Sequence, residues 1–96
     1  MSWEVRWTTA SLGDLKKIDR EAARNLIDVH INKVKTNPYS GKPLKKGLKL
    51  FNSYNLKFKN VEYRIAYKIF PEKKVVLVYM VGSRENFYRK LQRRIR

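Results

Sequence analysis

The sequence predicts a small α+β protein with the element order β-α-α-β-β-β-α, in which helices pack on one face of a mostly antiparallel sheet. Three observations lead to this fold class. Polar and apolar residues alternate in several stretches, apolar residues recur at helical spacing in others, and one stretch is apolar at every position. The chain has 96 residues, the length of one domain, so we expect residues 1–96 to fold as a single unit.

The N-terminal part predicts one strand followed by two helices. Residues 3–7 alternate between apolar and polar, which is typical of a short strand with one buried face. Apolar residues then recur every three or four positions, which predicts helices over about residues 10–18 and 20–35. Asn37-Pro38 ends the second helix, because proline disfavours the α conformation in the residue before it. Proline and glycine residues between 37 and 47 indicate a loop.

Three strands and a helix follow. Residues 54–58 and 63–69 alternate, which predicts two strands of a hairpin. Residues 75–81 are apolar throughout, as expected of an inner strand that is covered on both faces. Ser83 can cap a final helix, in which apolar residues recur at four-residue spacing up to Ile95. Short turns place these three strands side by side, and we expect the first strand to lie along one edge.

The net charge of +15 lies entirely in the later part of the chain. Residues 33–96 hold eighteen basic and three acidic residues, whereas residues 1–32 hold five of each. Such a concentration of positive charge attracts nucleic acid, an acidic protein or an anionic membrane surface. No apolar run is long enough to span a membrane, and the first residues lack the order of a signal peptide, so we expect a cytoplasmic protein without a membrane partner.

The composition offers few residues that could bind a metal ion. The chain has no cysteine and a single histidine, which leaves few ligands for a metal ion. We therefore expect a function that needs no metal and no other cofactor.

Polar residues are expected to gather on the open face of the sheet, at Asn55, Lys57, Lys59, Arg64 and Lys68, with Arg84 and Tyr88 just after the inner strand. Neighbouring strands lie ~4.8 Å apart and alternate residues ~6.6 Å apart, so this set fits within one or two nucleotides. Like charges so close together destabilise the free protein, and a bound polyanion explains why they are tolerated. Lysines on an open sheet face can also serve solubility alone.

Two motifs in this region carry a resemblance. Residues 54–59 run into a Tyr-Arg-x-x-Tyr strand at residues 63–67, and a Val-Gly-x-Arg corner begins at Val81. Together with the order of elements over the whole chain, they resemble the RelE/ParE superfamily of toxin–antitoxin toxins, and within it the RelE-type ribosome-dependent mRNA interferases. The resemblance implies a RelE-like fold of the microbial ribonuclease type.

The resemblance also implies an active site, which falls on Lys57, Lys59, Arg64, Arg84 and Tyr88. The implied reaction is cleavage of mRNA in the ribosomal decoding site, by attack of a ribose 2′-OH on the adjacent phosphorus to leave a 2′,3′-cyclic phosphate. Fixed guanidinium groups can stabilise the charge that builds on the phosphoryl oxygens. Because we expect no carboxylate or histidine on this face, Tyr88 and the two lysines are the candidates for general acid and base. Some relatives have a lysine in place of Asn55 and a longer spacing between Arg84 and Tyr88.

The remaining cationic and polar side chains are expected to hold RNA phosphates, at Asn55, Lys68, Arg89, Lys90, Arg93 and Arg94. The expected partners are a cognate acidic antitoxin, the ribosome with its RNA, and mRNA. We expect a monomer in the free state and larger complexes with the antitoxin. Two alternatives stay open: a ParE-like toxin that inhibits DNA gyrase and cleaves nothing, and a nucleic-acid-binding module without catalysis. The paired arginines and the tyrosine favour the nuclease.

Overall fold

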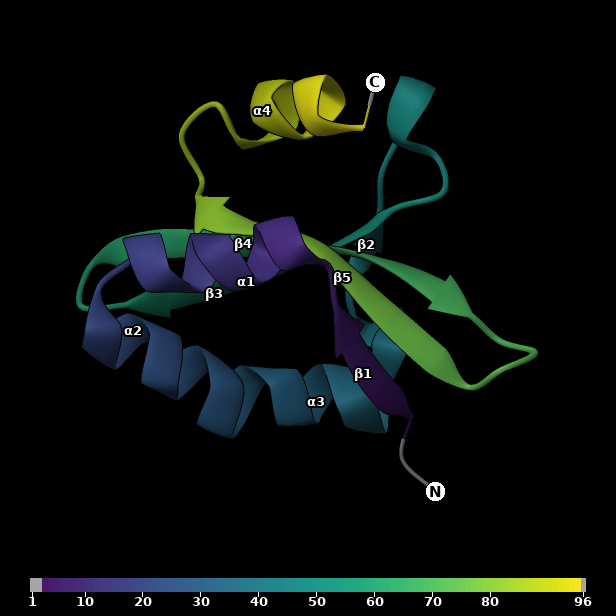
Figure 1. Cartoon of the computed structure of the whole chain (residues 1–96), viewed down its shortest axis with the longest axis horizontal. Coiled ribbons are helices and arrows are strands. Elements are labelled where there is room, and N and C mark those ends of the chain that lie inside the picture. Colours follow the sequence, from purple (N-terminus) through teal and green to yellow (C-terminus); the bar gives the residue numbers. More distant parts are fainter. Residues whose placement is uncertain (1–2, 96) are drawn as a thin grey trace.

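The computed structural model describes residues 3–95, apart from the side chain of Lys46, and these residues form an α+β fold around a five-stranded sheet (Figure 1). The strands lie in the order β1-β5-β4-β3-β2. Their bounds are β1 (Glu4–Trp7), β2 (Lys42–Pro43), β3 (Asn52–Phe58), β4 (Val61–Phe70) and β5 (Val75–Ser83). β1 runs parallel to β5, and the other neighbouring pairs are antiparallel. The predicted fold class and the edge position of the first strand are therefore confirmed.

The helical segments are α1 (Thr9–Lys17), α2 (Arg20–Asn25), the π-helical turn η1 (Leu26–His30), α3 (Ile31–Thr36) and α4 (Phe87–Arg94), with short 3-10 turns at η2 (Pro38–Ser40) and η3 (Lys46–Leu48). Thr8 and Asp19 start α1 and α2, because their side-chain oxygens accept hydrogen bonds from backbone amides three residues later. The run from α2 to α3 ends before Asn37-Pro38, as predicted. None of the helices described between residues 3 and 95 is long and apolar enough to cross a membrane.

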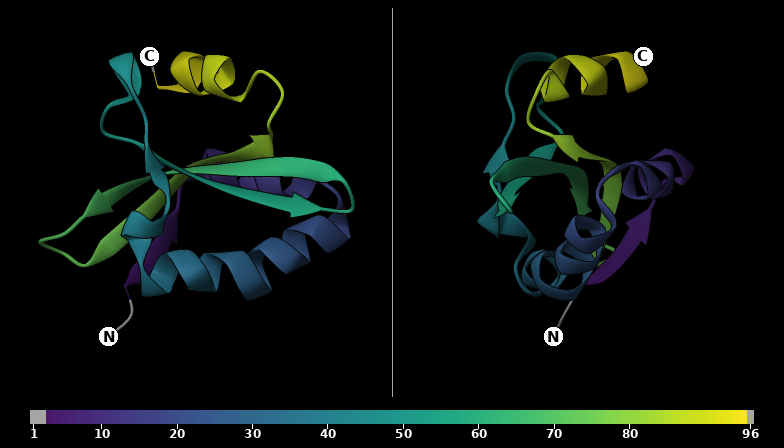
Figure 2. Two further views of the ribbon diagram at one scale, coloured as in Figure 1. Left: turned by 180° about the vertical axis from the view of Figure 1, so that it is seen from behind. Right: turned by 90° about the vertical axis from the view of Figure 1, so that its left-hand side faces the viewer.

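Both faces of the sheet are covered, each by a different apolar core. On one face, Leu26 and Val34 of the α2–α3 run pack against buried strand residues such as Ile65. On the other face, Phe87 and Leu91 of α4 pack against Ala66 and Met80, together with the loop that carries η3. The views in Figure 2 show α4 and the α2–α3 run on opposite sides of the sheet.

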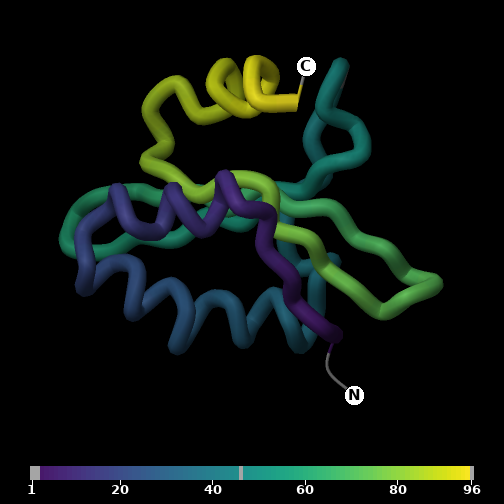
Figure 3. Tube along the Cα trace, viewed as in Figure 1, coloured from purple at the N-terminus to yellow at the C-terminus, as the bar shows by residue number. Residues whose placement is uncertain are grey.

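The expectation that all helices lie on one face is thus wrong for α4, and the face expected to be open is partly covered. The physical reason lies in the second face itself, where Ala66 and Met80 leave an apolar patch that needs cover. After β5 the chain bends back over this patch, and α4 comes to lie beside the loop of residues 44–51 (Figure 3). One part of the face that stays accessible is the corner where β3 and β5 end and β4 begins.

The β3–β4 hairpin sets the register of that corner. Lys59 and Asn60 both have positive φ angles, of 48° and 67°, and form the two-residue turn between Phe58 and Val61. This register places Lys57 opposite Glu62 and Asn55 opposite Arg64. On the other side of β4, Arg64 lies opposite Gly82 of β5. Residues that lie opposite each other share a face, so the corner collects side chains from β3 and β4, beside Gly82 of β5.

Candidate active site

The candidate site is formed by the last residues of β3, the first residues of β4, the bend after β5 and the first turn of α4. Asn86 has a positive φ of 56°, a conformation that asparagine tolerates better than most residues, and it turns the chain from the end of β5 into α4. The structure brings together six side chains here, from Asn55, Lys57, Glu62, Arg64, Arg84 and Tyr88. Five of these were predicted as site residues from the sequence.

Arg64 lies at the centre of this group. Its guanidinium carbon lies 4.9 Å from the ring centroid of Tyr88, a cation–π contact that holds both side chains. Gly82 lies directly opposite Arg64 on β5, and a side chain at that position would come into contact with Phe87 and Met80. The Arg64 Nε is buried and has no hydrogen-bond partner within the described part of the chain. A buried donor without an acceptor costs free energy, and a phosphate oxygen is the kind of acceptor that would satisfy it.

Arg84 follows β5 and is held by Glu62. Its backbone amide donates to the Glu62 carbonyl at 3.0 Å, and its Nη1 lies 3.4 Å from Glu62 Oε1. The two side chains are 65% and 42% exposed, so this ion pair adds little stability, and a phosphate can readily compete for the guanidinium. Arg84 is therefore oriented toward the site and still accessible.

Glu62 overturns the expectation that this face has no carboxylate. It precedes Arg64 by two residues, so the strand alternation places both on one face. The sequence contained this signal, but the expected strand began only at residue 63. Once the turn is known to consist of Lys59 and Asn60 alone, Glu62 falls inside β4 and opposite Lys57.

Lys59 is not part of the group. Its positive φ takes it out of the strand alternation, and its Nζ bonds to Glu21 Oε1 of α2 at 2.6 Å. That hydrogen bond, and the charge of Glu21, raise the pKa of the Lys59 ammonium. The structure thus places this side chain against α2, away from Arg64.

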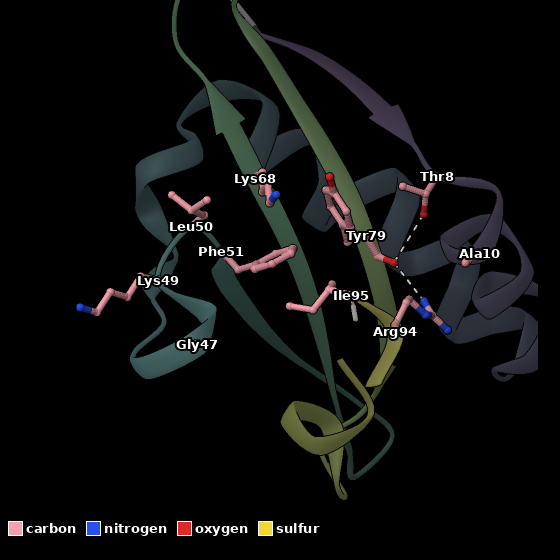
Figure 4. Close-up of a pocket in the computed structure, with 10 residues that line it drawn as sticks. All are labelled: Thr8, Ala10, Gly47, Lys49, Leu50, Phe51, Lys68, Tyr79, Arg94 and Ile95. Atoms are coloured by element: carbon pink, nitrogen blue, oxygen red, sulfur yellow. Dashed lines mark hydrogen bonds between the residues drawn. The ribbon is translucent and has the colours of Figure 1, made fainter. Parts of the chain in front are cut away.

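Lys68 shares the face of Arg64 but lies four residues further along β4. Its Nζ sits 4.9 Å from the ring centroid of Phe51 and 5.0 Å from that of Tyr79. These three side chains border a cavity of about 530 Å³ between β4, β5, the η3 loop and the C-terminal end of α4 (Figure 4). The structure therefore separates Lys68 from the site at the corner.

Arg94 has a structural partner. Its two terminal nitrogens bond to both carboxylate oxygens of Asp14 at 2.6 and 3.0 Å. Nη1 also donates to the Tyr79 carbonyl at 3.0 Å (Figure 4). Asp14 additionally accepts a hydrogen bond from the Val81 amide at 3.0 Å. This network fastens the end of α4 to α1 and β5. Other basic residues of α4 are exposed to solvent, namely Arg89, Lys90 and Arg93.

Asn55 and Lys57 are exposed on β3, at the border of the group. The Asn55 side-chain oxygen accepts a hydrogen bond from the Ser53 hydroxyl at 3.2 Å. No three histidine, aspartate or glutamate side chains between residues 3 and 95 lie close enough together to hold a metal ion. The six grouped side chains offer two guanidinium groups, one ammonium, one phenol, one carboxylate and one amide.

Solved structures with this fold define the class of protein. The toxin–antitoxin complex RelBE2 of Mycobacterium tuberculosis matches with a TM-score of 0.79 and 26% sequence identity, over 88% of this chain and 100% of that chain. A mutant of E. coli toxin RelE in the free state matches with a TM-score of 0.75 and 23% identity, over 100% of both chains. The intact E. coli RelBE toxin–antitoxin complex matches with a TM-score of 0.66 and 24% identity, over 86% of this chain and 98% of that chain. The fold is thus that of RelE toxins.

The family follows from the sequence. The model of the ParE-like toxins of type II bacterial toxin–antitoxin systems matches residues 7–92. The chain therefore belongs to this family and is a toxin of the RelE/ParE superfamily. A search of curated protein sequences finds no significant match.

Proposed function

We propose that this toxin is a ribosome-dependent endoribonuclease that cleaves mRNA in the decoding site. The observation that carries the proposal is the Arg64 guanidinium, held over Tyr88 with its Nε buried and unpaired among the described residues, while Arg84 lies at the same corner. Two guanidinium groups at one corner suit a phosphodiester whose oxygens gain negative charge during reaction.

The proposed reaction needs no group from outside the RNA and the protein. The ribose 2′-oxygen gives its proton to a base at the corner and bonds to the adjacent phosphorus, and the bond from phosphorus to the 5′-oxygen breaks. The leaving oxygen takes up a proton, and the products are a 2′,3′-cyclic phosphate and a 5′-hydroxyl. Arg64 and Arg84 stabilise the phosphoryl oxygens, while Lys57 and Tyr88 are the candidates for the proton donor.

Dependence on the ribosome is supported by how open the corner is. Lys57 and Arg84 are exposed, and Arg64 and Tyr88 are only partly buried. Such a surface offers little to align the 2′-oxygen, the phosphorus and the leaving oxygen, and this alignment contributes much of the rate in intramolecular reactions of this kind. A ribosome that holds the mRNA can supply it. The exposed basic residues of α4 are suited to contacts with ribosomal RNA phosphates.

An antitoxin is the second proposed partner. RelE toxins have been solved in complex with antitoxins from M. tuberculosis and E. coli. For this chain we propose a cytoplasmic acidic antitoxin, because a charge of +15 favours fast association with an acidic partner. The free toxin is expected to be a monomer and to form larger complexes with that antitoxin.

The test is to incubate the purified protein with mRNA bound to programmed ribosomes and to map any cuts in the mRNA by primer extension. We expect cuts inside translated frames, products with a cyclic phosphate, and no cutting of the same mRNA without ribosomes. Arg84→Ala serves as the matched inactive variant. Equal cutting of free and ribosome-bound mRNA would refute the dependence on the ribosome.

Inhibition of DNA gyrase is the second candidate function, and the match to the ParE-like toxin model favours it. A supercoiling assay with purified gyrase distinguishes the two. Inhibited supercoiling, together with intact mRNA on programmed ribosomes, would replace the nuclease proposal.

A further inference from the structure

We propose that Glu62 is the general base of the reaction and accepts the proton of the attacking 2′-OH. This inference rests on the nuclease function proposed above and adds a catalytic residue to it. The residues predicted for the site included no base that is ordinarily free of its proton at neutral pH, and the structure places the Glu62 carboxylate in the candidate site, opposite Lys57.

The position of Glu62 is fixed by its neighbours on both sides. On β3 it faces Lys57, and toward the β5 end its carbonyl accepts the backbone amide of Arg84. Along β4 it shares its face with Arg64, two residues away. The side chain is 42% exposed, so an RNA ribose can reach it. The carboxylate therefore lies among the three cations that would hold the phosphate.

Among the ionisable side chains at the corner, the carboxylate is the one suited to accept a proton. Lysine, arginine and tyrosine ordinarily carry their protons at neutral pH, whereas glutamate does not. The histidine of the chain cannot substitute, because His30 lies on the other face of the sheet, where its Nδ1 is 2.9 Å from the Tyr54 hydroxyl. Glu85 also lies near Glu62, along the groove formed by residues 60–62 and 83–86, but outside the paired strands.

The contact between Glu62 and Arg84 suggests how the base becomes available. At 3.4 Å between exposed groups, the pair is weak. A phosphate that binds Arg84 competes with the carboxylate for the guanidinium. The freed carboxylate then lies next to the bound phosphodiester, within reach of the adjacent 2′-OH.

The proposed step balances without a further reactant. The 2′-OH proton moves to a Glu62 oxygen as the bond between the 2′-oxygen and phosphorus forms. The bond between phosphorus and the 5′-oxygen breaks, and that oxygen receives a proton from Lys57 or Tyr88. Exchange with water afterwards returns Glu62 and the donor to their starting states.

The test is the single-turnover rate at which Glu62→Gln cleaves mRNA on programmed ribosomes. This substitution keeps the size of the side chain and removes its basicity. We expect the rate to fall by about 10²–10³-fold, as for the loss of a general base. Ribosome binding should be unchanged or tighter, because a negative charge is lost. Glu72→Gln is the matched control: it makes the same change in the β4–β5 turn, away from the site, and should cleave at the wild-type rate.

A pH profile separates a base from a purely electrostatic role. The ionisable groups facing Glu62 are Lys57 on β3, Arg64 on β4, and Arg84 and Glu85 after β5. With a carboxylate base, the wild-type rate should be nearly flat between about pH 6 and 8. The Glu62→Gln rate should rise with pH, as hydroxide or another group takes over. A wild-type rate that rises about tenfold per pH unit over this range would overturn the proposal.

The outcomes also separate this inference from the function on which it rests. If wild-type protein leaves ribosome-bound mRNA intact, the nuclease function fails, and the role of Glu62 fails with it. If wild-type protein cleaves, Arg64→Ala does not, and Glu62→Gln cleaves as fast as wild type, only the role of Glu62 is refuted.

Discussion

Replacing Arg94 by alanine tests whether α4 is held in place by its ion pair with Asp14. The substitution removes two charge-assisted hydrogen bonds to the carboxylate and one to the Tyr79 carbonyl. The side chains of Arg94 and Asp14 are only 29% and 10% exposed, so this pair is much less screened than a surface pair.

The magnitude follows from what each substitution leaves behind. Surface pairs contribute up to about 1 kcal/mol, and breaking a buried pair costs about 3–5 kcal/mol. After Arg94→Ala, Asp14 keeps its hydrogen bond from the Val81 amide, so we expect a loss of about 2 kcal/mol in the free energy of unfolding. Asp14→Ala also leaves that buried amide without its acceptor, and we expect a loss of about 3 kcal/mol.

Urea unfolding followed by circular dichroism measures both losses. For a chain of this size, the Arg94→Ala loss corresponds to a fall of about 8–16 °C in melting temperature. Arg93→Ala is the matched control, because its exposed side chain should change stability by less than about 0.5 kcal/mol. If Arg94→Ala unfolds at the same urea concentration as Arg93→Ala and wild type, the ion pair does not hold α4. Arg94→Ala should also lower the free energy of unfolding by less than Asp14→Ala does.

Four substitutions test the site, the core and the exposed basic residues of α4. Arg64→Ala and Arg84→Ala should each keep the fold, judged by circular dichroism, and lose ribosome-dependent cleavage by about 10²–10³-fold. Tyr67→Phe should cost about 1 kcal/mol in urea unfolding, because the buried hydroxyl donates to the Pro38 carbonyl at 2.7 Å. Burial raises the pKa of Tyr67 to about 12, so wild type should lose stability as pH rises from 10 to about 12, and Tyr67→Phe should lose less. Arg93→Ala should lower the slope of log ribosome affinity against log salt by about 0.7–0.9, measured by filter binding.

The order of the elements could be predicted because their hydrophobic periods are distinct. The alternation along β3 and β4, the continuous apolar run of β5 and the stop at Asn37-Pro38 each follow from local stereochemistry. The face that α4 covers could not be predicted in this way. Helical spacing shows which side of α4 is apolar, and the side of the sheet that receives it depends on the bend at Asn86 and on the patch around Met80.

The site was predictable where strand alternation decides the matter. Lys57 and Arg64 share a face because each lies at a polar position of a regular strand. Lys59 departs from this pattern because it belongs to the turn, where a positive φ redirects the side chain toward Glu21. Arg94 departs from its expected role because its partner Asp14 lies 80 residues earlier, a separation at which no local pattern acts.

That long separation has a consequence for when the corner is completed. Protein chains are synthesised from the N-terminus, and β4 with Arg64 emerges before α4. Tyr88 reaches Arg64 only when α4 packs on Met80, and Asp14 can fasten α4 only once residue 94 has left the ribosome. A nascent chain therefore carries the strands of the site before its tyrosine, and the contact between Tyr88 and Arg64 forms only after α4 has emerged.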